Sequence, residues 1–458
     1  MAARVSEASQ DRDRALPPTL TRALDHKVIA KQAEWRSPAV ASVVFRHGRP
    51  VWRGMVGSTD ADDPSAAPTP DTQFRMGSIT KTFTATLVMQ CRDEGLLDLD
   101  DRLDQHLPTE RHGRLTIRRM LAHLSGLQRE PVGEVWERAE GPDLEELLNR
   151  LDEAEAVLPP SRQHHYSNLA YSLLGEIVAR LRNQPWEEAL AERILSPLGM
   201  TRTTTRRQAP YALGYLTDPY ADRLLPEKEF PGGAFAPAAE LWTTVDDLAR
   251  WGTFIADADA TGVLSTATVD EMCTPNVIYD ADTWTLAWGL GFMLHRRGER
   301  VLAGHDGAMP GFLAGLAVRR ADRVGAAVLV NASASADPGG LAVELTTQVL
   351  DDDPDLPKPW VTGAPVPPEL EELLGTWWFE GVPFAFSVRE DKLQARAVES
   401  PRTQPPSVFA AEGTDLFRGV SGREHGELLR VVRDSEGKVD RLYWATYAGT
   451  RTPRPFGT

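Results

Sequence analysis

The stretch GSITKTF (residues 77–83) places a serine, Ser78, three residues before a lysine, Lys81. The lysine is notable because the 458-residue chain contains seven lysines and 43 arginines. A buried lysine can lose its proton, whereas an arginine effectively cannot. Residues three apart share one face of a helix, so the Ser78 hydroxyl and the Lys81 amine can meet. We therefore interpret Ser78 as a candidate nucleophile and Lys81 as part of the group that removes its proton.

Ser-x-x-Lys alone is a weak signal, because it occurs again at Ser435 and Lys438 in the turn-like sequence DSEGK. The first copy differs in its context: the apolar spacing of TKTFTATLVMQC predicts a helix that enters a core. A serine in the first turn of such a helix can also offer its backbone N–H to a developing oxyanion. The alternative is that Ser78 only caps the helix and Lys81 is a solvated charge.

The sequence HHYSNLAYSLLGEIVARL (164–181) predicts a second buried helix, with Tyr166 and Asn168 at its start. As a phenolate, Tyr166 could accept the serine proton, and a nearby Lys81 ammonium would lower the Tyr166 pKa to allow this. Asn168 could hold a substrate amide or orient Lys81. The alternative is a hydrogen-bonded core tyrosine and a capping asparagine.

A third stretch, AGHDGAMPGF (303–312), precedes an apolar strand. We expect residues 301–309 to form an edge strand in which Gly307 lets a substrate backbone approach closely. His305 would then point into the cleft, and the Ala308 N–H would be a second oxyanion donor beside Ser78. The alternative for His305 is a half-buried imidazole with satisfied hydrogen bonds.

Composition limits the classes of partner. The formal net charge of −16 argues against nucleic-acid binding and against an anionic membrane surface. The two cysteines, Cys91 and Cys273, predict neither a metal site nor a disulfide framework, and we expect no cofactor. The first 20 residues contain no apolar segment of a secretory signal, which predicts a cytoplasmic location.

The pattern of apolar residues predicts an α+β fold: an antiparallel sheet flanked by helices, with a helical subdomain, followed by a small all-β domain. Hairpins are expected at 39–57 and 313–332, and helices at 20–35 and 339–350. The domain boundaries that we predict are a catalytic domain at 1–352, a proline-rich linker at 353–368, and a β domain at 369–458.

The motifs SITK, YSN and HDG, in this order, resemble the penicillin-binding-protein and class C β-lactamase-like serine enzymes. Four further stretches also resemble segments of that family, namely LTIRRMLAHLSGL (115–127), ILSPLGM (194–200), PGGAFAPAAELWTTVDDLARW (231–251) and AWGLGF (287–292). The resemblance implies that Ser78 is acylated, Lys81 and Tyr166 transfer its proton, Asn168 contacts substrate, and the Ser78 and Ala308 amides form the oxyanion hole.

The third motif departs from the β-lactamase pattern, which usually has Lys-Thr-Gly where this chain has His305, Asp306 and Gly307. Histidine there is typical of the esterase, peptidase and thioesterase branches, so we expect no efficient β-lactamase activity. Asp306 and Gly307 are expected to contact substrate. So are two glycines of the glycine-rich segment and one C-terminal arginine, namely Gly232, Gly233 and Arg451.

Within the family, three features resemble the penicillin-binding-protein-type thioesterases. They are the expected cytoplasmic location, the β domain, which resembles a lipocalin-like tail, and a composition rich in arginine and alanine, which is typical of high-GC bacteria. Such an enzyme would take a peptidyl thioester ending in a D-residue, delivered by a carrier protein, and release it by head-to-tail macrocyclisation in nonribosomal peptide biosynthesis. A serine esterase or a D-stereospecific aminopeptidase or carboxypeptidase is the first alternative. A non-catalytic binding protein of the same fold is the second.

Overall fold

The computed structural model describes residues 15–333, 336–356, 360–401 and 404–455. It consists of two compact units, residues 1–356 and 357–458, which are described separately. Residues 1–14 of the N-terminus, and residues 357–359 of the expected linker, lie outside the described residues. In the part of the chain that is described, no helix combines the length and the apolar character needed to cross a bilayer.

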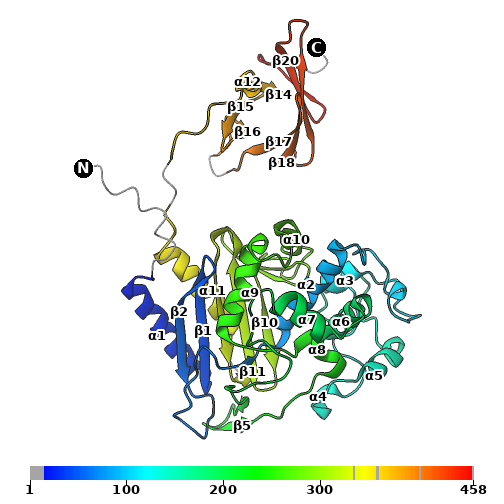
Figure 1. The fold of residues 1–458 in the computed structure, drawn as a ribbon, viewed down its shortest axis with the longest axis vertical. Coiled ribbons are helices and arrows are strands. Elements are labelled where there is room, and N and C mark those ends of the chain that lie inside the picture. Colours follow the sequence, from blue (N-terminus) through cyan, green and yellow to red (C-terminus); the bar gives the residue numbers. More distant parts are fainter. Residues whose placement is uncertain (1–14, 334–335, 357–359, 402–403, 456–458) are drawn as a thin grey trace. The chain divides into compact units, whose positions relative to one another are not determined.

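The first unit is built on an eight-stranded sheet in which all neighbouring strands are antiparallel (Figure 1), and its strand order is β2-β1-β12-β11-β10-β9-β8-β7. The strands are β1 (Ala39–Arg46), β2 (Arg49–Gly57), β7 (Val277–Ile278), β8 (Leu286–Trp288), β9 (Met293–Arg297), β10 (Arg300–Met309), β11 (Phe312–Arg319) and β12 (Val324–Val330). The β1–β2 and β11–β12 hairpins confirm the two that the sequence predicts.

Side chains alternate across the sheet and divide between two cores. Val40 and Val44 of β1 pack with helices α1 (Pro18–Trp35) and α11 (Pro338–Asp352) on one face. Val43 and Phe45 belong to the larger core on the other face, where α9 (Val245–Ala256) and α2 (Thr80–Asp93) lie. The central strands are therefore apolar at nearly every position, because both faces are covered.

Helix α2 is buried along almost its whole length, from Thr80 to Cys91, because the helical subdomain surrounds it. Figure 1 shows the helices of this subdomain gathered at one side of the sheet. They are α3 (Ile117–Leu121), α4 (Val135–Arg138), α5 (Leu144–Asn149), α6 (Asn168–Arg182), α7 (Trp186–Leu190) and α8 (Ala236–Ala239). Helix α10 (Thr266–Met272) ends beside the turn between β8 and β9, where the Leu290 N–H donates to the Met272 carbonyl oxygen at 2.9 Å. The smaller pairings are β3 (Phe74–Arg75) with β6 (Trp242–Thr243), and β4 (Tyr215–Thr217) with β5 (Leu224–Pro226) and β13 (Ala332–Ser333).

The second unit is a meander of eight antiparallel strands preceded by the short helix α12 (Pro368–Glu371). Backbone hydrogen bonds between Trp378 and Thr450, at 2.8 and 3.1 Å, bring the first and last strands together and nearly close a barrel. Aromatic side chains fill its interior, and Trp444 contacts four of them. The strands are β14 (Gly375–Phe379), β15 (Val382–Arg389), β16 (Lys392–Ala397), β17 (Ser407–Gly413), β18 (Leu416–Ser421), β19 (Leu428–Arg433), β20 (Val439–Trp444) and β21 (Tyr447–Gly449).

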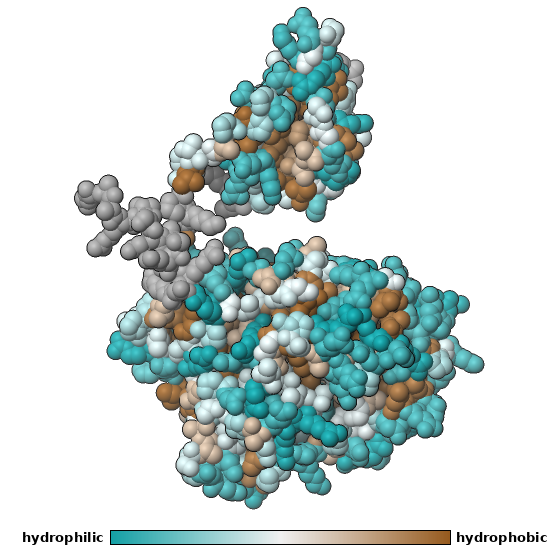
Figure 2. Space-filling view, in the orientation of Figure 1, coloured by the Kyte–Doolittle hydropathy of each residue, from teal (hydrophilic) through white to brown (hydrophobic). Residues whose placement is uncertain are grey.

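The predicted fold class is confirmed: an antiparallel sheet flanked by helices, a helical subdomain and an all-β C-terminal domain. One detail was wrong. Strand β10 is an interior strand over residues 300–304, where it pairs with β9, and has an open edge only from His305 onward. Figure 2 shows that the visible face of each unit is mostly hydrophilic, with apolar residues in small scattered patches, as is usual for protein surfaces.

Candidate active site

Ser78 lies in a single 3-10 turn, Gly77–Ile79, between β3 and the start of α2. Two glycines let this turn touch the open edge of β10. Gly77 has φ +52°, and a Cβ on it would fall 2.5 Å from the Ala308 nitrogen. A Cβ on Gly307 would fall 1.9 Å from the Met76 carbonyl oxygen and 3.2 Å from the Ser78 nitrogen. The backbone amides of Ser78 and Ala308 are thereby held side by side, as an oxyanion hole requires.

Lys81 is fully buried, and its Nζ lies 3.0 Å from the Ser78 Oγ. The amine also donates to the Ala238 carbonyl oxygen at 2.8 Å, which fixes its position from the side of α8. Burial holds the Lys81 pKa well below its usual value; Glu130 raises it and Arg129 lowers it further. An amine whose pKa is lowered in this way, next to a serine hydroxyl, is suited to act as a general base.

Tyr166 lies on the other side of Lys81, whose Nζ is 4.7 Å from the ring centroid. Burial raises the Tyr166 pKa above its usual value, and a hydrogen bond with Ser78 offsets only part of this effect. The expected Tyr166 phenolate is therefore wrong. It required a charged Lys81 to lower the Tyr166 pKa, but burial lowers the pKa of the Lys81 amine and raises that of the Tyr166 phenol.

Asn168 is the first residue of α6, and only 5% of it is exposed. Its amide nitrogen donates to both carboxylate oxygens of Glu130, at 2.9 and 3.0 Å. It forms no hydrogen bond with Lys81 among the described residues, so it influences Lys81 only through the position of Glu130. Glu130 was missed in the sequence, where it stands in a loop-like stretch outside every motif.

A cavity of about 450 Å³ opens beside Ser78. It follows the open edge of β10 as far as the N-terminus of α11. Its polar lining residues are Ser78, Arg129, His164, Tyr166, His305, Asp306 and Asp337, and its apolar wall includes Tyr279, Leu286, Trp288, Met293 and Leu313. The expected positions of His305, Asp306, Gly307 and Ala308 at the cleft agree with this lining.

His305 is 2% exposed, and burial lowers its pKa to about 3. Its Nδ1 donates to the Asp306 carbonyl oxygen at 2.5 Å, because that oxygen can only accept. His305 is therefore neutral, and its Nε2 presents a lone pair. It supplies no positive charge where β-lactamases of this kind usually have a lysine.

A second imidazole, His123, supports Tyr166 from behind. The two rings stack with centroids 4.3 Å apart, and the His123 Nδ1 accepts from the Ser167 N–H at 3.1 Å. His123 lies within the stretch 115–127 that resembles the family, but its side chain had no role in the sequence interpretation. Trp288, from β8, packs edge-on against both His123 and His305.

Three expected substrate contacts of the first unit, Asn168, Gly232 and Gly233, are not in the lining of this cavity. Gly232 and Gly233 pack on residues 141–142, where a Cβ on Gly233 would meet the Pro142 oxygen at 2.5 Å. The Arg451 guanidinium donates to the carbonyl oxygens of Leu374 and Thr376, and lies 3.8 Å from the Trp377 ring centroid. These contacts hold the Arg451 side chain against the barrel of its own unit, and its role as a substrate contact stays a prediction.

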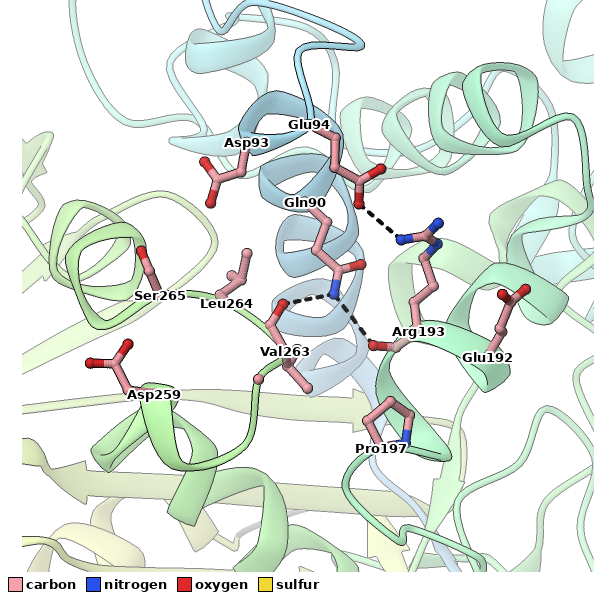
Figure 3. Close-up of a pocket in the computed structure, with 11 residues that line it drawn as sticks. Gln90, Asp93, Glu94, Glu192, Arg193, Pro197, Asp259, Val263, Leu264 and Ser265 are labelled. Atoms are coloured by element: carbon pink, nitrogen blue, oxygen red, sulfur yellow. Dashed lines mark hydrogen bonds and ion pairs between the residues drawn. The ribbon is translucent and has the colours of Figure 1, made fainter.

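A larger cavity, of about 620 Å³, lies at the far end of α2 (Figure 3). Gln90 bridges it with hydrogen bonds to the Val263 and Arg193 carbonyl oxygens, and Glu94 pairs with Arg193. Gln90 is 12 residues from Ser78, roughly 18 Å along a helix. Because it is remote from Ser78, we assign this cavity no catalytic role.

The family model "Beta-lactamase" matches residues 24–350. The chain belongs to this family. Penicillin-binding protein 4 of Amycolatopsis lactamdurans is 31% identical over 69% of this chain and 87% of the relative. Beta-lactamase-like protein 2 of Dictyostelium discoideum is 29% identical over 53% of this chain, which spans about half (47%) of that relative's length.

Solved structures share the fold. The octameric penicillin-binding protein homologue from Pyrococcus abyssi has a TM-score of 0.65 and 23% identity, covering 93% of this chain and 99% of its own. SurE has a TM-score of 0.59 and 23% identity, covering 95% and 99%. The family "Domain of unknown function" (DUF7586) matches residues 366–451, the region of the C-terminal barrel.

Proposed function

We propose that this protein is an acyl-transfer enzyme that forms an ester between Ser78 and the acyl group of its substrate. The observation that carries the proposal is the buried Lys81 amine, 3.0 Å from the Ser78 hydroxyl, whose pKa burial lowers well below its usual value. A lysine that only stabilised the fold would gain more from an acidic partner, whereas this one contacts a serine and a backbone carbonyl.

In the first step, Lys81 accepts the Ser78 proton while Oγ attacks the substrate carbonyl carbon. The negative charge that develops on the carbonyl oxygen is stabilised by the N–H groups of Ser78 and Ala308. When the tetrahedral intermediate collapses, the bond to the leaving group breaks. The leaving group takes the proton that Lys81 held.

Tyr166 fits the role of a proton relay in this second step. Burial raises its pKa, so it keeps its proton at neutral pH, and it lines the same cavity as Ser78. It can donate to the leaving atom as that atom separates, and recover a proton from the Lys81 ammonium. His123 stacks on its ring and limits its rotation.

The acceptor that releases the acyl group determines the biological role. We propose an amine of the same peptide, so that a peptidyl thioester with a D-residue at its C-terminus, brought by a carrier protein, is released by macrocyclisation. Two observations support this choice: the cavity has an apolar wall against which a folded peptide can pack, and His305 gives the site no cation for a β-lactam carboxylate. SurE was solved with D-Leu, which makes D-configured acyl groups the first to test.

The test is to incubate a short peptidyl thioester ending in a D-residue with the wild type and with Ser78→Ala, and to measure product masses. A product at the mass of the free peptide minus water, absent with Ser78→Ala, is expected. A linear acid alone would replace cyclisation with hydrolysis.

Hydrolysis of D-amino-acid amides or esters is the second candidate. It is favoured by the similarity in fold to a D-stereospecific amidohydrolase from Streptomyces sp. (TM-score 0.61, 23% identity). Steady-state assays with D- and L-phenylalanine amide and with p-nitrophenyl esters distinguish it from cyclisation. A folded protein in which a fluorophosphonate does not label Ser78 would indicate a binding role instead.

A further inference from the structure

Two carboxyl side chains meet where the cavity reaches α11. Asp306 packs on the first turn of that helix, since a Cβ on Gly339 would lie 2.0 Å from its Oδ1. That oxygen is buried and has no hydrogen-bond partner among the described residues. Asp337 caps the same helix by accepting from the Gly340 N–H at 2.8 Å. A buried carboxyl group beside a second carboxylate, with no cation of the described chain paired to either, favours a ligand that brings positive charge.

His305 adds an independent observation along the same edge of β10. The side chain is almost completely buried, and its Nδ1 proton is used by the Asp306 carbonyl. Its Nε2 therefore carries a lone pair, and it has no partner within the described part of the chain. The side chains of His305, Asp306 and Asp337 therefore bring no positive charge to this part of the cavity.

The cationic side chain in the cavity lining, Arg129, lies at the opposite end of the cavity. The Arg129 guanidinium carbon is 4.9 Å from the Tyr166 ring centroid, and its Nε is 3.4 Å from a Glu130 oxygen. Within the described residues, neither Asp306 nor Asp337 forms an ion pair with a lysine or an arginine.

Asp306 stands two residues before Ala308, a separation of about 6.6 Å along a strand. A group bound there lies roughly one residue away from the reacting carbonyl.

We infer that Asp306 and Asp337 form a subsite that binds an ammonium group, about one residue from the reacting carbonyl, on the molecule that reacts at Ser78. This inference rests on the proposed acyl transfer and specifies which ligands the site takes. It selects amine-bearing ligands and rejects those with a carboxylate at this position. Burial, with the repulsion of Asp337, raises the Asp306 pKa to about 7, so a positive ligand would also restore its full charge.

The test compares matched esters that differ in one charge. Hydrocinnamoyl thioesters of thiocholine and of 3,3-dimethylbutanethiol place a cation or its neutral isostere in the leaving group. The p-nitrophenyl esters of glycyl- and glycolyl-D-phenylalanine place an ammonium or a hydroxyl in the acyl group. At pH 8 we expect the cationic member to have a kcat/KM at least tenfold higher in one of the two series.

Asp306→Asn and Asp337→Asn should each reduce that ratio at least fivefold. Asparagine keeps the shape of both side chains and remains a good helix N-cap. Asp352→Asn is the matched control: it removes one charge from the same helix, but at its exposed far end. A wild-type ratio near one in both series, or a ratio that neither variant changes, would overturn the inference while leaving acyl transfer intact.

Fluorophosphonate labelling of Ser78 separates this failure from failure of the proposed function. If Ser78 is not labelled and no ester reacts, acyl transfer is wrong, and the subsite is then tested by binding alone. Choline, but not 3,3-dimethylbutanol, should raise the melting temperature of the wild type, and this difference should disappear in Asp306→Asn. Equal shifts by the two compounds would overturn the subsite itself.

Discussion

The backbone of Gly307 lies directly against that of Met76, so closely that a Cβ on the glycine would be 1.9 Å from the Met76 carbonyl oxygen. This contact joins β10 to the turn that carries Ser78. It sets the spacing of the two amides that would stabilise an oxyanion, and it depends on the lack of a side chain at one position.

Gly307→Ala should therefore separate the Ser78 and Ala308 amides. We expect kcat/KM for p-nitrophenyl esters to fall about 10²-fold or more, as when one oxyanion donor is removed. Gly413→Ala, where the added Cβ meets only Leu416 at 3.7 Å, is the control. Wild-type activity in Gly307→Ala would mean that the contact does not position the oxyanion hole.

Lys81→Arg keeps a long cationic side chain but removes a group that can become neutral. We expect kcat to fall about 10³-fold, within the range for loss of a general base. The chain supplies its own control, because the second Ser-x-x-Lys contains Lys438, which is paired on the surface with Glu436. Lys438→Arg should retain full activity, and comparable losses in the two variants would contradict the role of Lys81.

Tyr166→Phe tests proton donation to the leaving group. Alkyl thioesters and amides need a proton more than p-nitrophenolate does, so the variant should lose at least about tenfold more activity on an amide than on a p-nitrophenyl ester. Equal losses on both substrates would assign Tyr166 to positioning. Ser78 labelling by a fluorophosphonate checks that the variant still folds.

Glu130 raises the Lys81 pKa, although burial outweighs it. Glu130→Gln removes this charge and should lower the Lys81 pKa further. Lys81 must be neutral to act as a base, so the acidic limb of the kcat/KM profile should move to lower pH. The pH profile of an ester substrate measures this shift, with the exposed Glu145→Gln as control. A move to higher pH would show that the Asn168–Glu130 pair acts in another way.

The raised pKa of Asp306 predicts that the free energy of unfolding depends on pH. Its folded-state pKa is raised to about 7, above the unfolded value, so the folded state binds the proton more tightly. Stability is therefore lost as pH rises toward 7, and the loss is complete above it. Asp306→Asn should stabilise the protein more at pH 8 than at pH 5.5, by about 1–2 kcal/mol in the difference. Thermal unfolding at the two pH values measures this. An equal effect at both would mean that the folded carboxyl has an ordinary pKa.

The sequence alone predicted the elements that local pattern controls. The spacing of apolar residues after Ser78 and Asn168 gave helices α2 and α6, and the His47–Gly48 turn gave the first hairpin, where both residues have positive φ. The order of the SITK, YSN and HDG motifs also brought Ser78, Tyr166 and His305 to one cavity. These features follow from period and from turn chemistry, which neighbouring residues determine.

The protonation states of the site residues and their hydrogen-bond partners could not be predicted from the sequence pattern. Whether Lys81 is neutral, and Tyr166 protonated, depends on burial by segments distant in the chain. The hydrogen bonds from Asn168 to Glu130 and from Arg451 to backbone carbonyl oxygens of the barrel also join residues distant in the chain. The sequence thus determined which reactive groups the protein carries and on which elements they lie. Only the tertiary structure decided their charges and contacts, because desolvation and Coulomb interactions depend on distances in space rather than on separation along the chain.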